Sequence, residues 1–146
     1  MRHQVFGRKL SRDINARKAL LINLTSALFE NGKITTTLSK AKFAKSYAEK
    51  LVTNAKKNRL HTKRVLASNL SAKAFARLTG EISRGFTNRV GGYTRIVKLG
   101  TRLGDRAEMA RLELLQWEAP TPKKTAKKVT KDKKSKTNEK RQTKSN

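Results

Sequence analysis

The apolar residues that can build a core stop abruptly near residue 118. All eight aromatic residues precede Pro120, and between residues 121 and 146 only Ala126 and Val129 are apolar. That last stretch carries eleven Lys and Arg against two acids, so it cannot bury enough surface to offset the entropy of ordering it. We therefore expect one folded domain over residues 1–118 and a Lys-rich, disordered extension over residues 119–146.

The excess of positive charge indicates what kind of partner the chain binds. The 146 residues include 36 Lys and Arg against 10 Asp and Glu, a formal net charge of +26. A small domain ordinarily carries a net charge of about 2–8 in magnitude, and a much larger value strains the compact state by self-repulsion unless a polyanion neutralises it. Nucleic acid is the leading candidate, and an anionic membrane surface is the second.

Several functional classes lack their characteristic residues. The chain has no cysteine, which excludes disulfides and thiolate metal sites. No apolar run approaches the roughly 20 residues of a membrane span, and the first twelve residues lack the apolar core of a secretory signal, so we expect a cytoplasmic protein. His3 and His61 lie in basic segments, and neither HExxH nor GxSxG occurs. We expect no catalytic residue, no metal, no cofactor and no small-molecule substrate.

The spacing of apolar residues changes from helical to strand-like along residues 1–118. The first predicted elements are a helix over 11–31 stopped by Gly32, a strand over 33–37, and a helix capped by Thr37 or Ser39 that runs to Asn58. Two shorter helices follow, one capped by Thr62 and the other capped by Ser71 and ended by Gly80. The last elements are strands over 93–99 and 109–117, joined by a nine-residue loop. This order, helices first and strands last, predicts an α+β fold.

Four glycines lie among basic residues in RVGGYTRIVKLGTRLGD, residues 89–105, which raises the possibility of a nucleotide-binding loop. Neither GxGxxG nor GxxxxGK[ST] occurs, and Gly91-Gly92 precedes a strand rather than a helix, so a phosphate loop is disfavoured. The simpler interpretation is that the glycines shape turns, with Asp105 capping a turn over 106–110. The basic residues near this strand pair are predicted to cluster around one of its ends and to contact phosphates: Arg89, Arg95, Lys98, Arg102 and Arg106.

The N-terminal residues repeat this pattern of concentrated positive charge. Within residues 1–18 the only acid is Asp13, among Arg2, His3, Arg8, Lys9, Arg12, Arg17 and Lys18. Phe6 and Leu10 are suited to anchor such an arm, and Gly7 permits a bend. Basic arms of this kind order on the irregular surfaces that RNA offers.

Several segments match a known family in order. They are MRH…GRKLSR at 1–12, RKALLINL at 17–24, ITTTLSKAK at 34–42, AEKL at 48–51, GGYTRIVKLGTRLGD at 91–105 and MARLEL at 109–114. On these motifs the chain closely resembles the bacterial-type ribosomal protein L17 family of the large subunit. The resemblance implies an α+β fold of helices packed on a small mixed β-sheet, no catalytic activity, and a structural role near the rim of the nascent-chain exit tunnel.

The resemblance also implies the partners, which are large-subunit ribosomal RNA and neighbouring large-subunit ribosomal proteins. Matched to the family motifs, the RNA-contacting residues would be Arg2, His3, Arg8, Lys9, Arg12, Arg17, Thr36, Lys40, Lys42, Tyr93, Arg95, Lys98 and Arg102, to which the charge cluster adds Arg89 and Arg106. Two features depart from the family pattern. Ala16 stands where a histidine often precedes Arg17, and the Lys-rich extension continues past the usual end of the family near Trp117. The extension is either solvated or bound to phosphates, and we expect RNA.

Three other functions stay open on the sequence. A free nucleic-acid chaperone or nucleoid-type DNA binder needs a dimer seam or a recognition helix, and neither is evident. An RNA-modifying enzyme needs a nucleophile or an acid in a cleft, and the sequence shows no such grouping. Membrane-surface binding would use the amphipathic faces of the first two helices, which a shared core explains more simply.

Overall fold

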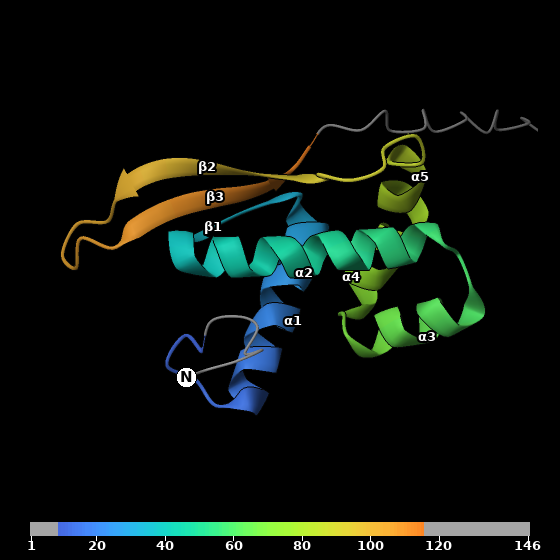
Figure 1. Ribbon diagram of the computed structural model, residues 1–146, viewed down its shortest axis with the longest axis horizontal. Coiled ribbons are helices and arrows are strands. Elements are labelled where there is room, and N and C mark those ends of the chain that lie inside the picture. Colours follow the sequence, from blue (N-terminus) through green and yellow to red (C-terminus); the bar gives the residue numbers. More distant parts are fainter. Residues whose placement is uncertain (1–8, 116–146) are drawn as a thin grey trace, which may run out of the picture.

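The structure of the protein, a computed structural model, describes residues 9–115 (Figure 1). The extension at 119–146 and the residues before Lys9 lie outside this part, so the predictions made for them stay predictions. The elements are α1 (Ile14–Asn31), β1 (Lys33–Thr37), α2 (Leu38–Lys56), α3 (Leu60–Ser68), α4 (Ala72–Arg77), the π-helical turn η1 (Leu78–Ile82), α5 (Ser83–Gly85), β2 (Thr94–Thr101) and β3 (Glu108–Leu114).

Local signals set both ends of α1. The Asp13 carboxylate accepts a hydrogen bond from the Ala16 N–H at 3.1 Å, which satisfies one of the free donors at the start of the helix. Gly32 ends the helix in the left-handed conformation, with φ +77°, and its N–H donates to the Leu28 carbonyl at 2.8 Å. The predicted helix and its glycine stop are confirmed.

The three strands form one sheet in the order β1-β3-β2. Both pairings are antiparallel, so the α+β class is confirmed, but the sheet is not the mixed sheet that the family resemblance implied. The reason is that β2 and β3 form a hairpin, which forces them to run in opposite directions, and β3 then pairs antiparallel with β1 on its other side. Ile34, Leu112 and Ile96 share one row across the sheet and face the helices.

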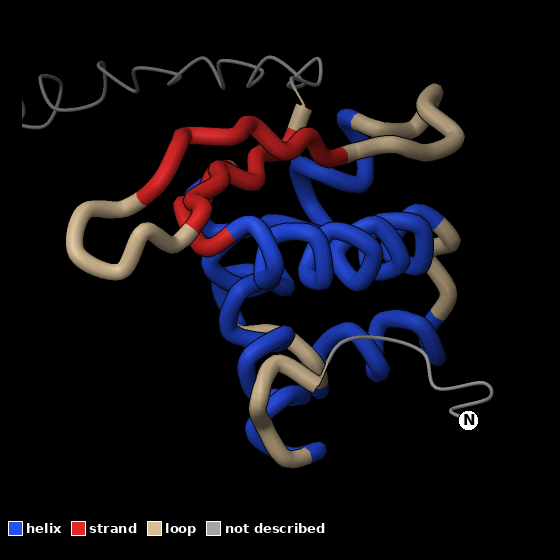
Figure 2. Tube along the Cα trace, turned by 60° about the vertical axis from the view of Figure 1, so that its left-hand side comes forward, coloured by secondary structure: helices blue, strands red, loops and turns tan. Residues whose placement is uncertain are grey.

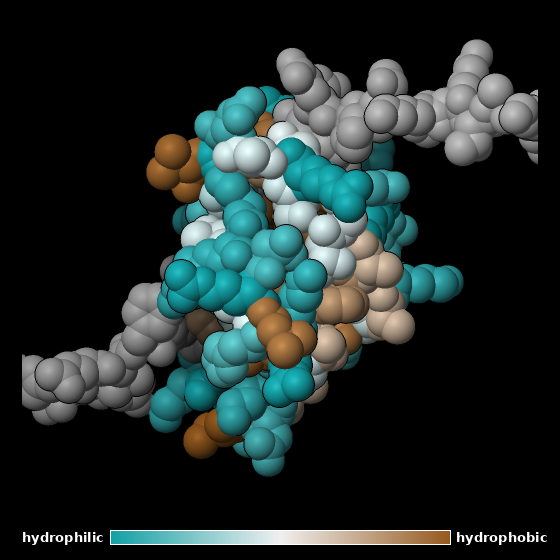
Figure 3. All heavy atoms as spheres, turned by 90° about the vertical axis from the view of Figure 1, so that its right-hand side faces the viewer, coloured by the Kyte–Doolittle hydropathy of each residue, from teal (hydrophilic) through white to brown (hydrophobic). Residues whose placement is uncertain are grey.

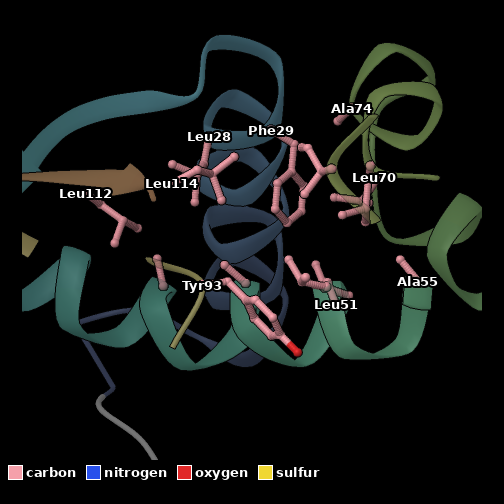
Figure 4. Packing of buried hydrophobic residues seen from close by; sticks show 14 of the residues in the cluster. Leu28, Phe29, Leu51, Ala55, Leu70, Ala74, Tyr93, Leu112 and Leu114 are labelled. Carbon is pink, nitrogen blue, oxygen red and sulfur yellow. The ribbon is translucent and has the colours of Figure 1, made fainter. Parts of the chain in front are cut away.

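Helix α2 covers the inner face of the sheet, and Figure 2 shows the strands as a layer over the helices. The buried positions of α2 include Ala44 and Ala48, whose small side chains let the sheet approach closely. Figure 4 shows Leu28 and Phe29 of α1 directed into the space above α2, with Leu112 of β3 farther to the left in the same core. Complete burial of one such leucine contributes about 1.5–3 kcal/mol of hydrophobic stabilisation.

Two predictions about the middle helices are wrong. Helix α3 begins at Leu60, and the Thr62 hydroxyl donates to the Arg59 carbonyl at 2.7 Å instead of capping the helix. Gly80 does not end a helix, because the chain continues through η1 and α5 as far as Gly85. Tertiary packing keeps it helical, since Leu78, Ile82 and Phe86 are all buried at helical spacing on one side of this segment.

Ser71 caps α4, as the sequence predicts. Its hydroxyl oxygen accepts the Ala74 N–H at 3.2 Å, and the hydroxyl donates to the Glu30 carboxylate of α1. Replacing Ser71 by Ala should lower the free energy of unfolding by about 1 kcal/mol, measured by urea denaturation. Thr62→Ala is the matched control and should change it by less than about 0.5 kcal/mol. Equal losses in the two variants would contradict the assignment of the cap.

Candidate nucleic-acid interface

The outer face of the sheet carries a row of charged side chains. Lys33, Glu113 and Arg95 lie opposite one another across the three strands, and Arg111 follows in the next outward position of β3. Period-two alternation sends these side chains away from the face that α2 covers. In Figure 1, α1 and α2 both lie on the other side of the sheet. We call Lys33, Arg95, Arg111 and Glu113 the outer-face cluster.

One carboxylate lies between two arginines in this cluster and forms hydrogen bonds with one of them. The Arg95 guanidinium donates from Nε and Nη2 to Glu113 Oε1 at 2.9 and 2.7 Å, and Arg111 Nε lies 3.4 Å from Glu113 Oε2. The Glu113 side chain is only 18% exposed, whereas that of Arg95 is 63% exposed. The acid therefore fixes the guanidinium plane of Arg95 and leaves its cationic surface outward, whereas it contacts Arg111 only as an ion pair, since Arg111 Nε has no hydrogen-bond partner within the described residues. Sequence analysis missed Arg111, although the alternation of charged and apolar residues along β3 could have revealed it.

The loop between β2 and β3 is shorter than predicted. The strands extend to Thr101 and from Glu108, which leaves six residues, 102–107, between them. The Arg102 guanidinium spans the loop and donates to both Asp105 carboxylate oxygens, at 3.1 and 2.6 Å. Hydrogen bonding to Arg102 is the largest cause that lowers the pKa of Asp105 to about 2, and the Ala107 N–H adds to it. Asp105 thus closes a turn, but residues 108–110 form a strand.

The predicted cluster at one end of the strand pair is wrong, because β2 separates its members. Arg95 lies at the start of β2 and Arg89 precedes the strand, whereas Arg102 and Arg106 lie in the loop beyond its end. Eight strand residues span about 26 Å at a rise of about 3.3 Å each. Figure 1 shows the β2–β3 hairpin extending away from the helices with this loop at its tip. The positive charge is spread along the hairpin.

Tyr93, which the family motifs placed among the RNA-contacting residues, has its side chain in the core. It is 1% exposed, its ring lies 5.1 Å from that of Phe86, and its hydroxyl donates to the Val90 carbonyl at 3.0 Å. The Lys56 ammonium lies 5.4 Å from the ring centroid. Strand β2 begins only at Thr94, so the alternation that placed Tyr93 beside Arg95 does not extend to it.

A groove joins the outer-face cluster to the end of α1. Its volume is about 610 Å³, and Arg89 and Arg95 line it together with Lys33 and Glu113. The Arg89 side chain folds back and donates from Nε to the Gly91 carbonyl at 3.0 Å. Lys33 and Arg89, which are 56 positions apart in the sequence, thus line the same basic groove, because β1 and β2 flank β3.

The other predicted residues lie elsewhere on the surface. Lys9 and Arg12 precede α1 and are exposed, and Arg17 is half-buried on its first turn. Lys42 is exposed and Lys40 half-buried in the first turns of α2. Thr36 and Lys98 lie in one row on the inner face of the sheet, on either side of Ala110. The predicted residues Arg2, His3 and Arg8 lie outside the described part of the chain.

Neither a metal centre nor a membrane span is present between residues 9 and 115. No three His, Asp and Glu side chains in that part are grouped so as to hold an ion. None of its helices combines the length and apolar character that crossing a bilayer requires.

The fold and the charge distribution define a basic α+β protein with cations on one sheet face and along a protruding hairpin. The chain belongs to the ribosomal protein L17 family, whose sequence model matches residues 20–115. It is therefore a ribosomal protein with a structural and non-enzymatic role. The family resemblance seen in the sequence motifs is confirmed.

Individual relatives match over most of the chain. The large ribosomal subunit protein bL17 of Methylacidiphilum infernorum is 44% identical over 130 residues, which are 88% of this chain and 99% of the relative. The bL17 protein of Campylobacter hominis is 49% identical over 116 residues, 79% of this chain and 98% of the relative. That of Bacteroides fragilis is 43% identical over 138 residues, 93% and 86% of the two chains.

The Arg102–Asp105 pair yields a prediction about titration. Because the folded-state pKa of Asp105 is lowered, the pair stabilises the loop above the ordinary carboxyl pKa, and this contribution is lost as the pH falls towards 2. Carboxyl NMR should give Asp105 a pKa of about 2. In the Arg102→Ala variant the Asp105 midpoint should rise towards the ordinary value. An unchanged Asp105 midpoint would contradict the role given to Arg102.

Proposed function

We propose that this protein is a structural component of the large ribosomal subunit that binds its ribosomal RNA through the outer-face cluster, the adjoining groove and the hairpin loop. The observation that carries the proposal is the gathering of Lys33, Arg95 and Arg111 on one sheet face, with Arg89 in the groove beside them. Cations brought together by folding repel one another, and RNA phosphates relieve that repulsion. The names of the relatives support the large subunit as the site of assembly.

The geometry suits a phosphate backbone better than a single small anion. The orienting acid Glu113 holds the Arg95 fork, and Asp105 holds that of Arg102 about one strand length away. Fixed guanidinium planes lose little side-chain entropy when they donate to phosphate oxygens. A series of such contacts along the hairpin therefore suits successive phosphates of an RNA strand or of two neighbouring strands.

The proposal extends to the remaining predicted residues and to location. Lys9, Arg12 and Arg17 near the start of α1, together with Arg2, His3 and Arg8 before them, form a basic arm that orders on RNA. Further RNA contacts come from Thr36, Lys40, Lys42, Lys98 and Arg106. By family resemblance the protein lies near the rim of the nascent-chain exit tunnel, beside other large-subunit proteins, in cytoplasmic ribosomes. Tyr93 has no part in this surface, because it is buried.

Binding of the full chain to protein-free large-subunit ribosomal RNA tests the proposal. Affinity should fall steeply with salt, and Arg95→Ala and Arg102→Ala should each weaken binding by about tenfold and reduce the log–log salt slope by about 0.7–0.9. Both side chains are more than half exposed, so the fold should be unchanged by circular dichroism. Lys73→Gln, an exposed lysine of α4, is the control.

Two results would contradict this assignment. A nearly flat salt dependence of the wild-type protein would show that stacking or protein contacts dominate in place of phosphates. Loss of folding in Arg95→Ala or Arg102→Ala would show that these arginines stabilise the protein and do not primarily serve the RNA.

A further inference from the structure

A second hollow lies outside all the residues of the proposed interface. It is formed by the end of α2, by α3 and by the continuous helical segment from α4 to α5, and it has a volume of about 680 Å³. This is the size range of sites that hold small molecules or single nucleotides. Figure 3 faces the side of the molecule that carries α3, α5 and the end of α2, and hydrophilic residues dominate its centre.

The charges in this hollow are all positive. Its lining includes Lys56, Lys63 and Arg84, and no acidic residue. The Lys56 ammonium donates to the Arg89 carbonyl and lies over the Tyr93 ring, so it is already engaged. Within residues 9–115, in contrast, neither the Lys63 ammonium nor the Arg84 guanidinium forms an ion pair or a hydrogen bond. Two cations are thus available to an anion.

Three hydroxyl groups follow one another along one wall of the hollow. Thr79 and Ser83 are four residues apart and share one side of the helical segment, and Thr87 follows just beyond its end at Gly85. Each hydroxyl donates to a main-chain carbonyl, at 2.9, 2.9 and 2.7 Å respectively. With their hydrogens engaged, the oxygens are left as acceptors. They suit a ligand that donates, and a ribose 2′-hydroxyl donates whereas a phosphate oxygen does not.

Gly80 lies in the same wall, and neither backbone conformation nor packing within the described residues requires a glycine there. Its φ is not in the left-handed range, and an added Cβ would meet no atom within 4 Å. Glycine in the interior of a helical segment destabilises the free fold relative to alanine. Close approach of a ligand backbone is the remaining physical reason for a residue without a side chain at this position. The π-helical turn that contains Gly80 widens the helix at the same point.

We propose that this hollow binds the ribose–phosphate backbone of an RNA strand. Phosphates lie on Lys63 and Arg84, a 2′-hydroxyl donates to the Thr79 or Ser83 oxygen, and the strand passes directly over Gly80. The inference rests on the proposed function, because the RNA is that of the large subunit, and it adds a second contact region separate from the outer-face cluster. The lack of acids in the lining favours RNA over a segment of a neighbouring protein.

Charge-removing variants of the full chain test this with protein-free large-subunit ribosomal RNA as the probe. Lys63→Gln/Arg84→Gln should lower affinity by about tenfold and the log–log salt slope by about 1.4, for two contacts to a single strand. The matched control is Arg64→Gln/Lys73→Gln, which removes the same charge from exposed positions outside the lining. It should change affinity by less than about threefold.

Gly80→Ala gives an independent test, because it should change the stability of the free protein and its affinity for RNA in opposite directions. The melting temperature of the free protein should rise by a few degrees, because alanine favours the helix, while affinity for the RNA falls because the methyl group occupies the path of the strand. A merely structural role for Gly80 would not raise stability and lower affinity together. Unchanged affinity in this variant would overturn the close approach.

A comparison of single-stranded poly(U) with poly(dT) tests the hydroxyl row. The wild-type protein should prefer the RNA, and Ser83→Ala should reduce that preference by about threefold or more, since one acceptor is lost.

The outcomes separate this inference from the proposed function. If the wild-type protein binds no ribosomal RNA, both fail. If it binds but the two double variants have equal affinity, the hollow is not an RNA site and the outer-face assignment stands. Protection of Lys63 from chemical modification only in complete subunits, and not on naked RNA, would assign the hollow to a protein neighbour and overturn the proposal.

Discussion

The packing of α2 across one face of the sheet is the constraint on which the rest of the structure depends. Small residues such as Ala44 and Ala48 bring the helix close to Leu112 and its neighbours, so the inner face takes up most of the apolar residues of the strands. Because side chains alternate along each strand, the residues between these inward positions point to the outer face of the sheet. Lys33, Arg95 and Arg111 gather on the outer face for this reason.

The few acids of the hairpin organise the positive charge more than they neutralise it. Glu113 contacts two arginines and Asp105 holds the fork of one, and both carboxylates leave the cations facing outward. Such exposed pairs contribute little to stability by themselves. Their effect is geometric, since they fix guanidinium groups that would otherwise be flexible. A polyanion then binds cations that are already placed, and it also relieves their mutual repulsion.

Features with local causes could be predicted from the sequence, and those that depend on distant partners could not. The Gly32 stop and the Ser71 cap each follow from signals within a few residues. Gly80, in contrast, is carried through a helix by the burial of residues on both sides of it, and Tyr93 is buried against Phe86 and Lys56. The spread of the basic residues along the hairpin depends on strand length and register, which composition does not give. The family was evident from the order of the motifs.

Fractionation of lysate on a sucrose gradient in moderate salt tests the central claim most directly. The account predicts that the protein sediments mainly with large ribosomal subunits, and that a triple Gln variant of Lys33, Arg95 and Arg111 shifts towards the top of the gradient while remaining folded. The exposed-charge variant Arg64→Gln/Lys73→Gln should stay with the subunits. Wild-type protein found mainly outside the large-subunit fractions would contradict the account, and so would a triple variant that sediments like the wild type.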